Sequence, residues 1–326
     1  MTPTAGLVDA PRELPSGAPP GARLLLGGPI AAEIRVGVQR DVASLRRRHG
    51  FVPGVTIVLA GKDPASRVYA GRILRNAEAL GLPSRLVELP ASATATRLRR
   101  VLEAQNADPL VGGIIVQMPL PPGIPLRTVI ESIDPQKDID GIHPLNTGLM
   151  TLGYTGYFPS CAEAAVEILK RSGYGLSGMS AVVVGRSNVV GKPAHLLLMR
   201  EDATVTVCHR KTRDLAGALG AADVVVVAAG MPGLIRGEML KPGAIVVDCG
   251  INVVDGQIIG DVHLPSVSQV ASVVTPVPGG VGPVTNAVLM EHLVRAARSQ
   301  LDGGAVATLR GRGRTSVEHV RPAAAS

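Results

Sequence analysis

The sequence predicts an α/β protein built from two α/β domains with a cleft between them, the second being a Rossmann-type domain that binds NADP. First, strand-like and helix-like stretches alternate along most of the chain, which is typical of βαβ units on parallel sheets. Second, 46% of the residues are hydrophobic but only 2% are aromatic, so Val, Leu, Ile and Ala must form the core, as in a parallel sheet covered by helices. Third, 326 residues suffice for about two domains.

The expected strands are short, rich in Val and Ile, and bounded by Gly, Pro or Asp. They cover residues 55–60, 113–117, 181–185, 204–208, 224–228 and 245–249. Helices are expected over residues 30–48, 64–80, 94–105, 161–171, 191–200 and 284–299. Two clear strands therefore precede residue 145 and four follow residue 160.

A seam is expected near residues 145–160, where Gly148, Gly153, Gly156 and Pro159 interrupt any periodicity. We therefore expect a first catalytic domain over residues 23–150 and a Rossmann domain over residues 151–300, whose last helix packs back on the first domain. Residues 1–22, rich in Pro, Gly and Ala, predict a disordered leader, and residues 301–326 a flexible tail.

Composition excludes several classes of protein. The formal charge is +7, but no aromatic residue follows Tyr174, so a nucleic-acid surface with stacking rings is not expected. No apolar run is long enough to span a membrane. The three cysteines are far apart in sequence and the histidines lack metal-site spacing, so we expect reduced thiols in a cytoplasmic protein, with no disulfide and no metal site.

A dinucleotide site is predicted where the strand at 181–185 meets the helix at 191–200. Gly185 closes the strand and Gly191 allows close helix packing, so backbone amides and the helix N-terminus can hold a pyrophosphate. The next strand ends at His209 and Arg210, where NAD enzymes place an acidic residue. With Arg186 in the first turn, these basic groups favour the 2′-phosphate of NADP, the alternative being a solvated loop.

Polar groups in the first half form a second candidate site. Tyr69 lies near the start of a helix, Gln117 ends a strand before a Pro-rich turn, and Asp140 lies among turn-forming residues. Residues 275–283 form a Pro/Gly loop before the last helix, and such loops are uncommon inside domains unless they are functional. Because Tyr154, Tyr157 and Phe158 fall in the seam, we expect aromatic side chains to gather around the cleft.

Eight motifs in order resemble the bifunctional methylenetetrahydrofolate dehydrogenase/cyclohydrolase family, called FolD in bacteria, over about residues 24–298. They are DPASRVY, GGIIVQMPLP, KDIDGIHPLNTG, VVGRSNVVGKP, TVTVCHRKT, DCGIN, GDV and TPVPGGVGP. The resemblance implies a homodimer that binds a one-carbon derivative of tetrahydrofolate. NADP takes a hydride from 5,10-methylenetetrahydrofolate, and water then opens the 5,10-methenyl product to 10-formyltetrahydrofolate.

The resemblance also assigns roles to residues. Tyr69, Gln117 and Asp140 are the implied catalytic groups: Tyr69 stacks on the folate ring, Gln117 bonds near the reacting centre and Asp140 anchors the pterin. The other implied substrate contacts are Pro119, Pro276, Pro278, Gly279 and Gly280. The implied cofactor contacts are Gly185, Arg186, Ser187, His209, Arg210, Ile251 and Thr285.

Two positions depart from the family pattern. The family places a catalytic Lys four residues after the tyrosine, where this chain has Ile73, and Pro159 is followed by Ser-Cys-Ala rather than Cys-Thr-Pro. Ile carries no titratable proton, and a guanidinium such as that of Arg72 stays charged and cannot act as a base. We therefore expect a dehydrogenase with weak or absent cyclohydrolase activity. The alternatives are a fully bifunctional enzyme and a silent folate- or NADP-binding paralogue.

Overall fold

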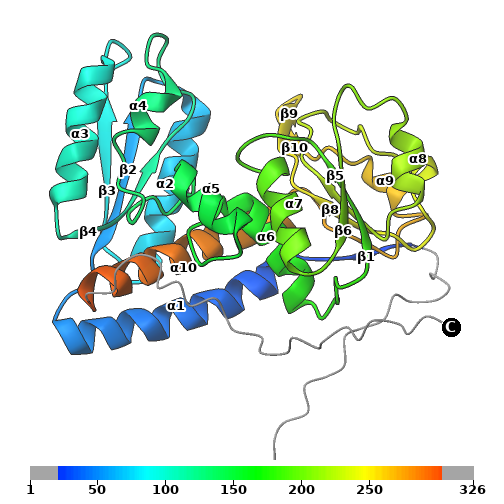
Figure 1. The fold of residues 1–326 in the computed structure, drawn as a ribbon, viewed down its shortest axis with the longest axis horizontal. Helices are drawn as coiled ribbons and strands as arrows, with labels where there is room; N and C mark the ends of the chain where they lie inside the picture. The colour runs from blue at the N-terminus through cyan, green and yellow to red at the C-terminus, as the bar shows by residue number, and fades with distance from the viewer. Residues whose placement is uncertain (1–20, 303–326) are drawn as a thin grey trace, which may run out of the picture.

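The computed structural model describes residues 21–302, so most of the expected leader and nearly all of the expected tail lie outside the described residues. Figure 1 shows two α/β lobes side by side, with the long helices α1 (Gly27–His49) and α10 (Val281–Leu301) running beneath them. Among the described residues, no helix combines the length and the apolar character needed to cross a membrane.

The first lobe contains a parallel sheet in the order β3-β2-β4. Its elements are β2 (Gly54–Ala60), α2 (Pro64–Ala79), β3 (Ser84–Leu89), α3 (Ala95–Ala107), β4 (Val111–Val116) and α4 (Leu126–Ile130). The expectation of only two strands here was wrong. β3 is an edge strand, and its SRLVEL sequence keeps partly exposed polar residues that hide the strand signal.

The second lobe contains a parallel six-stranded sheet in the order β1-β11-β8-β7-β5-β6. The strands are β1 (Arg23–Leu24), β5 (Ser180–Val184), β6 (Thr204–Cys208), β7 (Val224–Val227), β8 (Ile245–Asp248) and β11 (Val273–Val274). The helices are α6 (Ser160–Arg171), α7 (Gly191–Arg200), α8 (Leu215–Gly220), η1 (Gly237–Met239) and α9 (Leu264–Val267). β9 (Asn252–Val254) and β10 (Gln257–Ile259) form an antiparallel hairpin.

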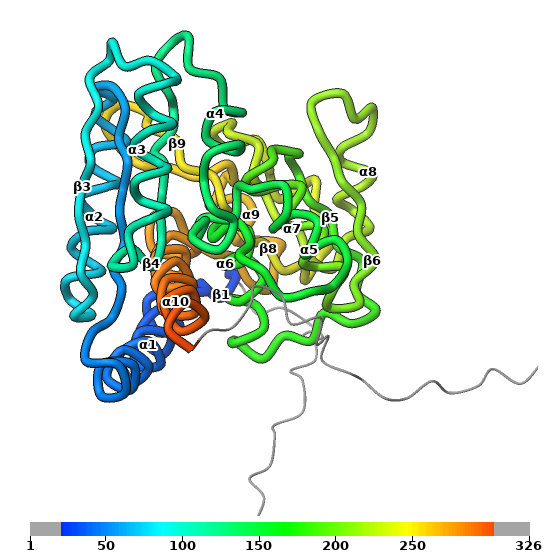
Figure 2. Tube along the Cα trace, turned by 60° about the vertical axis from the view of Figure 1, so that its left-hand side comes forward, coloured from blue at the N-terminus to red at the C-terminus, as the bar shows by residue number. Residues whose placement is uncertain are grey.

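The two ends of the described chain join the lobes. β1 pairs with β11 in the second lobe, and α1 then runs beneath the first. α10 returns alongside α1, as Figures 1 and 2 both show, and Gln300 Nε2 donates to the Gly112 carbonyl oxygen at 2.8 Å. One cluster of buried hydrophobic residues includes members from both lobes and from both long helices, so the core is continuous between them.

The seam is not the irregular connection that its glycines suggest. Helix α5 (Pro144–Thr151) occupies part of it. His143 is the N-cap of this helix, and its Nδ1 accepts a hydrogen bond from the Leu145 amide at 3.0 Å. Pro144 is at the first helical position, where its missing N–H costs nothing. The local cap and proline therefore outweigh the low helix propensity of Gly148.

Candidate active site

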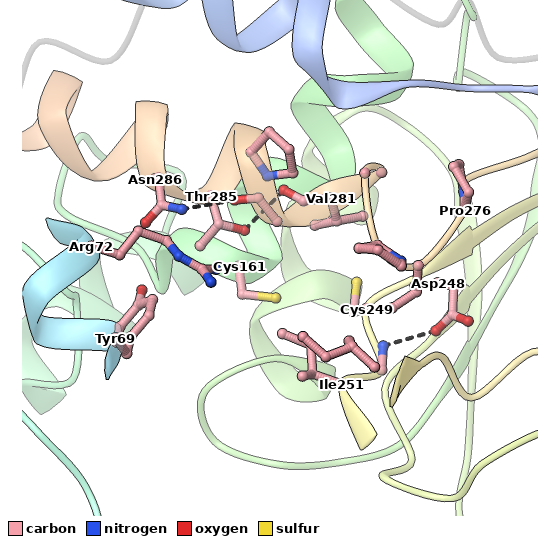
Figure 3. Close-up of a pocket in the computed structure, with 18 of the residues that line it drawn as sticks. Tyr69, Arg72, Cys161, Asp248, Cys249, Ile251, Pro276, Val281, Thr285 and Asn286 are labelled. Carbon is pink, nitrogen blue, oxygen red and sulfur yellow. Dashed lines mark hydrogen bonds between the residues drawn. The ribbon is translucent and has the colours of Figure 1, made fainter. Parts of the chain in front are cut away.

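A cavity of about 500 Å³ lies where the two lobes meet α10. Its lining comes from α1, α2, α6, the turn after β8, and the loop that leads into α10 (Figure 3). The lining residues include Arg35, Tyr69, Arg72, Asn76, Cys161, Asp248, Cys249, Gly250, Ile251, Ile258, Thr285, Asn286 and every residue from Pro276 to Pro283. Residues far apart in sequence thus meet around one space large enough for a small organic ligand.

The predicted site residues divide into two groups. Those that line this cavity are Tyr69, Ile251, Pro276, Pro278, Gly279, Gly280 and Thr285. Those that lie beyond its wall are Gln117, Pro119, Asp140, Gly185, Arg186, Ser187, His209 and Arg210. The first group therefore includes both Tyr69 and the Pro/Gly loop. Most of the second group lies at strand ends of the two sheets.

Helix α2 places Tyr69 at one end of the cavity. The Asp63 carboxylate caps the helix by accepting from the Ser66 amide at 2.7 Å. The Ser66 hydroxyl is 2.7 Å from the Met118 carbonyl oxygen, so the start of α2 is held next to the turn that carries Gln117 and Pro119. Burial keeps the pKa of Tyr69 well above its usual value, so this side chain presents a neutral ring and hydroxyl.

Asp140 lies close to this end of the cavity. Its charge acts on both Tyr69 and Cys161, and its carboxylate accepts a hydrogen bond from the Ser160 hydroxyl at 3.2 Å. Burial, together with the neighbouring Asp138 carboxylate, raises the pKa of Asp140 to about 7. A carboxyl group in this state can donate or accept a proton near neutral pH.

The loop that carries Asp140 is held by buried partners. Asp138 is fully buried, and its Oδ2 accepts from the His143 amide at 2.7 Å and from Asn146 Nδ2 at 3.0 Å. His292 of α10 is also fully buried, with Nδ1 2.8 Å from the Ile139 carbonyl oxygen and Nε2 2.9 Å from Glu163 Oε2. Because a carbonyl oxygen only accepts, Nδ1 carries the proton in this contact.

Ile73 is one turn beyond Tyr69 on α2 and belongs to the continuous core. Its side chain is 0% exposed. The guanidinium of Arg72, by contrast, lines the cavity and is exposed. The charged group that α2 presents to the cavity next to Tyr69 is therefore the guanidinium of Arg72, which cannot act as a base.

The turn after β5 has little room for side chains. Gly185 has φ +123°, and a Cβ there would lie 2.1 Å from the Ala228 carbonyl oxygen. A Cβ on Gly191 would lie 2.2 Å from the Gly185 carbonyl oxygen. The Ser187 hydroxyl accepts from the Val190 and Gly191 amides at 3.1 and 3.3 Å, so it holds the turn together.

Basic residues follow two neighbouring strands at this edge of the sheet. β6 pairs with β5, and the Gly185 amide donates to the Cys208 carbonyl oxygen at 2.9 Å, which places His209 and Arg210 beside Arg186. Arg186 and Arg210 are exposed. Arginines at the carboxyl ends of neighbouring parallel strands suit a phosphate group.

Two buried carboxylates hold the turns at the other strand ends, and sequence reasoning assigned them no role. Asp261 is fully buried and accepts from the amides of Ala229, Gly230 and Met231 at 2.6–2.9 Å and from Asn252 Nδ2 at 2.9 Å. Asp248 accepts from the amides of Gly250, Asp261 and Val262 at 2.8–3.1 Å. The available signals were an Asp that ends a Val-rich strand, at Asp248, and an Asp that follows a Gly, at Asp261.

Several cavity residues were missed for a physical reason. Arg35 and Asn76 lie on amphipathic helices, where sequence reasoning treats polar residues as solvent-facing. Asn286 is 7% exposed, and within the described residues its Oδ1 has no hydrogen-bond partner. Cys161 and Cys249 are far apart in sequence but line the same cavity.

The expectation that seam aromatics gather around the cleft was wrong. Tyr157 and Phe158 are buried in the continuous core. The guanidinium of Arg295 lies over the Tyr157 ring at 4.9 Å, and that of Arg200 over the Phe158 ring at 5.1 Å. These rings stabilise the junction of the lobes through packing and cation–π contacts, whereas Tyr69 is the ring that lines the cavity.

Comparison with known proteins gives consistent matches. Residues 25–140 match the family model for the tetrahydrofolate dehydrogenase/cyclohydrolase catalytic domain, and residues 159–301 match the NAD(P)-binding domain of the same family. The bifunctional protein FolD of Roseiflexus sp. (strain RS-1) is 44% identical over 281 residues, covering 86% of this chain and 98% of its own length.

Solved structures agree. The bifunctional enzyme FolD of Campylobacter jejuni superposes with a TM-score of 0.83 at 39% identity, covering 86% of this chain and 99% of that chain. The FolD of Trypanosoma brucei, solved with NADP and an inhibitor, has a TM-score of 0.83 at 36% identity with the same coverage. These matches confirm the predicted α/β architecture with a nucleotide-binding Rossmann-type domain.

Proposed function

The chain belongs to the tetrahydrofolate dehydrogenase/cyclohydrolase family, and from that premise we propose that it carries both activities of the family name. It oxidises 5,10-methylenetetrahydrofolate to the 5,10-methenyl compound with NADP, and it hydrolyses that compound to 10-formyltetrahydrofolate. The observation that carries this proposal is the cavity, which Tyr69 lines together with the Pro/Gly loop and the turn after β8. The names of the similar proteins support the bifunctional reading.

The second lobe fits NADP. The close approaches at Gly185 and Gly191 keep side chains away from the turn, which leaves room for a pyrophosphate against the start of α7. Arg186, His209 and Arg210 then bind the 2′-phosphate, which favours NADP over NAD. When bound, the cofactor supplies the hydride acceptor. Ile251 and Thr285, which line the cavity, would hold the nicotinamide end of the cofactor.

The first lobe positions the folate. Tyr69 offers an uncharged aromatic face for the substrate ring system, and Gln117 and Asp140 bind its polar edge. Pro276, Pro278, Gly279 and Gly280 form the opposite wall, and Pro119 closes the turn beside Gln117. Holding the folate carbon near the nicotinamide is the main requirement for hydride transfer, because proximity and orientation supply much of the rate.

In the proposed assembly two copies of the chain form a homodimer, which analytical ultracentrifugation tests.

A second candidate function is a dehydrogenase whose hydrolytic activity is weak or lost. One observation favours it: Ile73 stands where the family resemblance implies a catalytic Lys, and its side chain is sealed in the core. Loss of a general acid–base group typically lowers a rate by about 10² to 10⁴. Asp140, with a pKa of about 7, is a group close to Tyr69 that can exchange a proton in place of the Lys.

One assay separates these functions. Purified protein is mixed with 5,10-methylenetetrahydrofolate and NADP, and NADPH, methenyl and formyl products are followed separately. Formyl product forming much faster than in an enzyme-free control supports the bifunctional proposal. NADPH with accumulating methenyl product supports the second candidate. Absence of NADPH overturns both and favours a silent binding paralogue.

A further inference from the structure

Two cysteines that the proposed function does not use lie together in the cavity. Cys161 is the second residue of α6, and Cys249 follows β8 directly. Figure 3 shows the two sulfur atoms on facing sides of the same space, and each thiol shifts the pKa of the other. Both cysteines are partly exposed, so a small reagent entering the cavity can reach them.

The two thiols differ in reactivity. Cys161 lies in the first turn of a 12-residue helix, where the helix dipole stabilises a thiolate. The neighbouring Cys249 thiol and Thr285 hydroxyl hold the pKa of Cys161 below its usual value, although burial and Asp140 oppose this. The pKa of Cys249 is raised by its contact with Cys161 and by burial. Cys161 is therefore the nucleophile and Cys249 the neighbouring thiol.

We propose that Cys161 and Cys249 form an oxidative modification site that reacts with hydroperoxides and closes to an intramolecular disulfide. In the first step the Cys161 thiolate attacks a peroxide oxygen, the O–O bond breaks, and the leaving oxygen takes a proton, giving Cys161 sulfenic acid and water or an alcohol. In the second step Cys249 sulfur attacks the Cys161 sulfur, the S–O bond breaks, and water leaves with the Cys249 proton. The peroxide gains two electrons, one from each cysteine sulfur.

Cys208 provides a matched internal control. It is 1% exposed, at the end of β6 within a separate apolar cluster of the second lobe. Burial raises its pKa, so it stays a thiol. Because the chain has three cysteines, the proposal predicts that mild oxidation consumes two thiols and leaves Cys208.

The test uses the full-length reduced protein without folate or NADP, so its outcome is independent of the proposed enzymatic function. The protein is treated with a small excess of hydrogen peroxide, remaining thiols are alkylated, and intact mass and non-reducing peptide maps are recorded. We expect the mass of the monomeric protein before alkylation to fall by two hydrogen atoms. The peptide map should show one linkage, joining Cys161 to Cys249, and dithiothreitol should reverse it.

Variants assign the two roles. We expect Cys249→Ser to stop at a Cys161 sulfenic acid that dimedone traps, Cys161→Ser to leave Cys249 reduced, and Cys208→Ser to form the disulfide as the parent does. Three free thiols after treatment of the parent protein, or a disulfide that includes Cys208, would overturn the proposal. Because the peptide map of the parent decides this, the result does not depend on the folding of any variant.

Discussion

The two lobes build their halves of the site by different means. In the second lobe the turns at the strand ends are shaped by the backbone. Their glycines leave no room for a Cβ, and the Asp261 carboxylate accepts hydrogen bonds from three backbone amides. In the first lobe individual side chains on α2 and in the 138–140 loop, such as Tyr69 and Asp140, provide the chemistry. A single substitution can therefore change the chemistry of the first lobe without altering its fold, whereas the second lobe resists change in its shape.

The largest effect on stability and binding is expected in the second lobe, where the backbone shapes the site. Gly185→Ala places a Cβ against the Ala228 carbonyl oxygen at a φ that L-residues rarely adopt. We expect a loss of about 3 kcal/mol or more in the free energy of unfolding. NADP binding should also be lost, as measured by urea denaturation and calorimetric titration.

The matched control is Gly37→Ala inside α1, where a Cβ has open space. It should raise the free energy of unfolding by about 0.5–1 kcal/mol and leave NADP binding unchanged. If Gly185→Ala binds NADP as tightly as the parent, the backbone-built description of the second lobe is wrong.

Ile73→Lys tests the first lobe, where individual side chains provide the chemistry. Because position 73 is fully buried, we expect the free energy of unfolding to fall by about 2–5 kcal/mol. If the second candidate function is correct, hydrolysis of methenyltetrahydrofolate per folded molecule should rise on the order of 10²-fold. Stopped-flow absorbance together with urea denaturation measures both.

Ile73→Leu nearly conserves volume and brings no proton. It should cost less than about 1.5 kcal/mol and leave hydrolysis unchanged. Equal hydrolysis by the parent, Ile73→Lys and Ile73→Leu would show that residue 73 does not limit that step.

Two buried aspartates sharpen the comparison further. Each oxygen of Asp261 accepts two hydrogen bonds, so Asp261→Asn turns an amide NH₂ toward two donors and should cost about 2–4 kcal/mol. Both hydrogen bonds of Asp138 go to Oδ2, so Asp138→Asn can place its NH₂ on the other side and should cost about 1 kcal/mol or less. Urea denaturation of both variants gives the difference, and equal costs would contradict the assignment.

The last comparison concerns pH. The pKa of Asp140 is about 7 in the folded protein and near 3.8 when unperturbed, so between these values the folded state binds more protons than the unfolded state. Its contribution to stability is therefore complete below about pH 4 and is lost as the pH rises toward 7.

An uncharged amide at this position should remove that dependence. We expect Asp140→Asn to be stabilised relative to the parent as the pH rises from 4 to 7, which denaturant titrations at several pH values will detect. A stability difference between the two proteins that stays constant across this range would refute the proposed ionisation.

Much of the architecture followed from local pattern. The six expected strands and six expected helices all correspond to elements in the structure, because each buried strand is a short run of Val and Ile and each long helix has an apolar face. Gly81 follows the last residues of α2 with a positive φ of +70°, a conformation that glycine favours after a helix. The edge strand β3 and helix α5 were missed because partial exposure in one and glycine in the other hide the periodicity.

The composition of the site followed from sequence motifs only in part. Tyr69, Ile251, Thr285 and the Pro/Gly loop belong to motifs and do line the cavity. The pairing of Cys161 with Cys249, the buried amide of Asn286 and the sealed position of Ile73 depend on contacts between distant segments. Hydrophobic periodicity reports which face of one element is buried, but not which elements share a wall, because that depends on how the two sheets and α10 pack together.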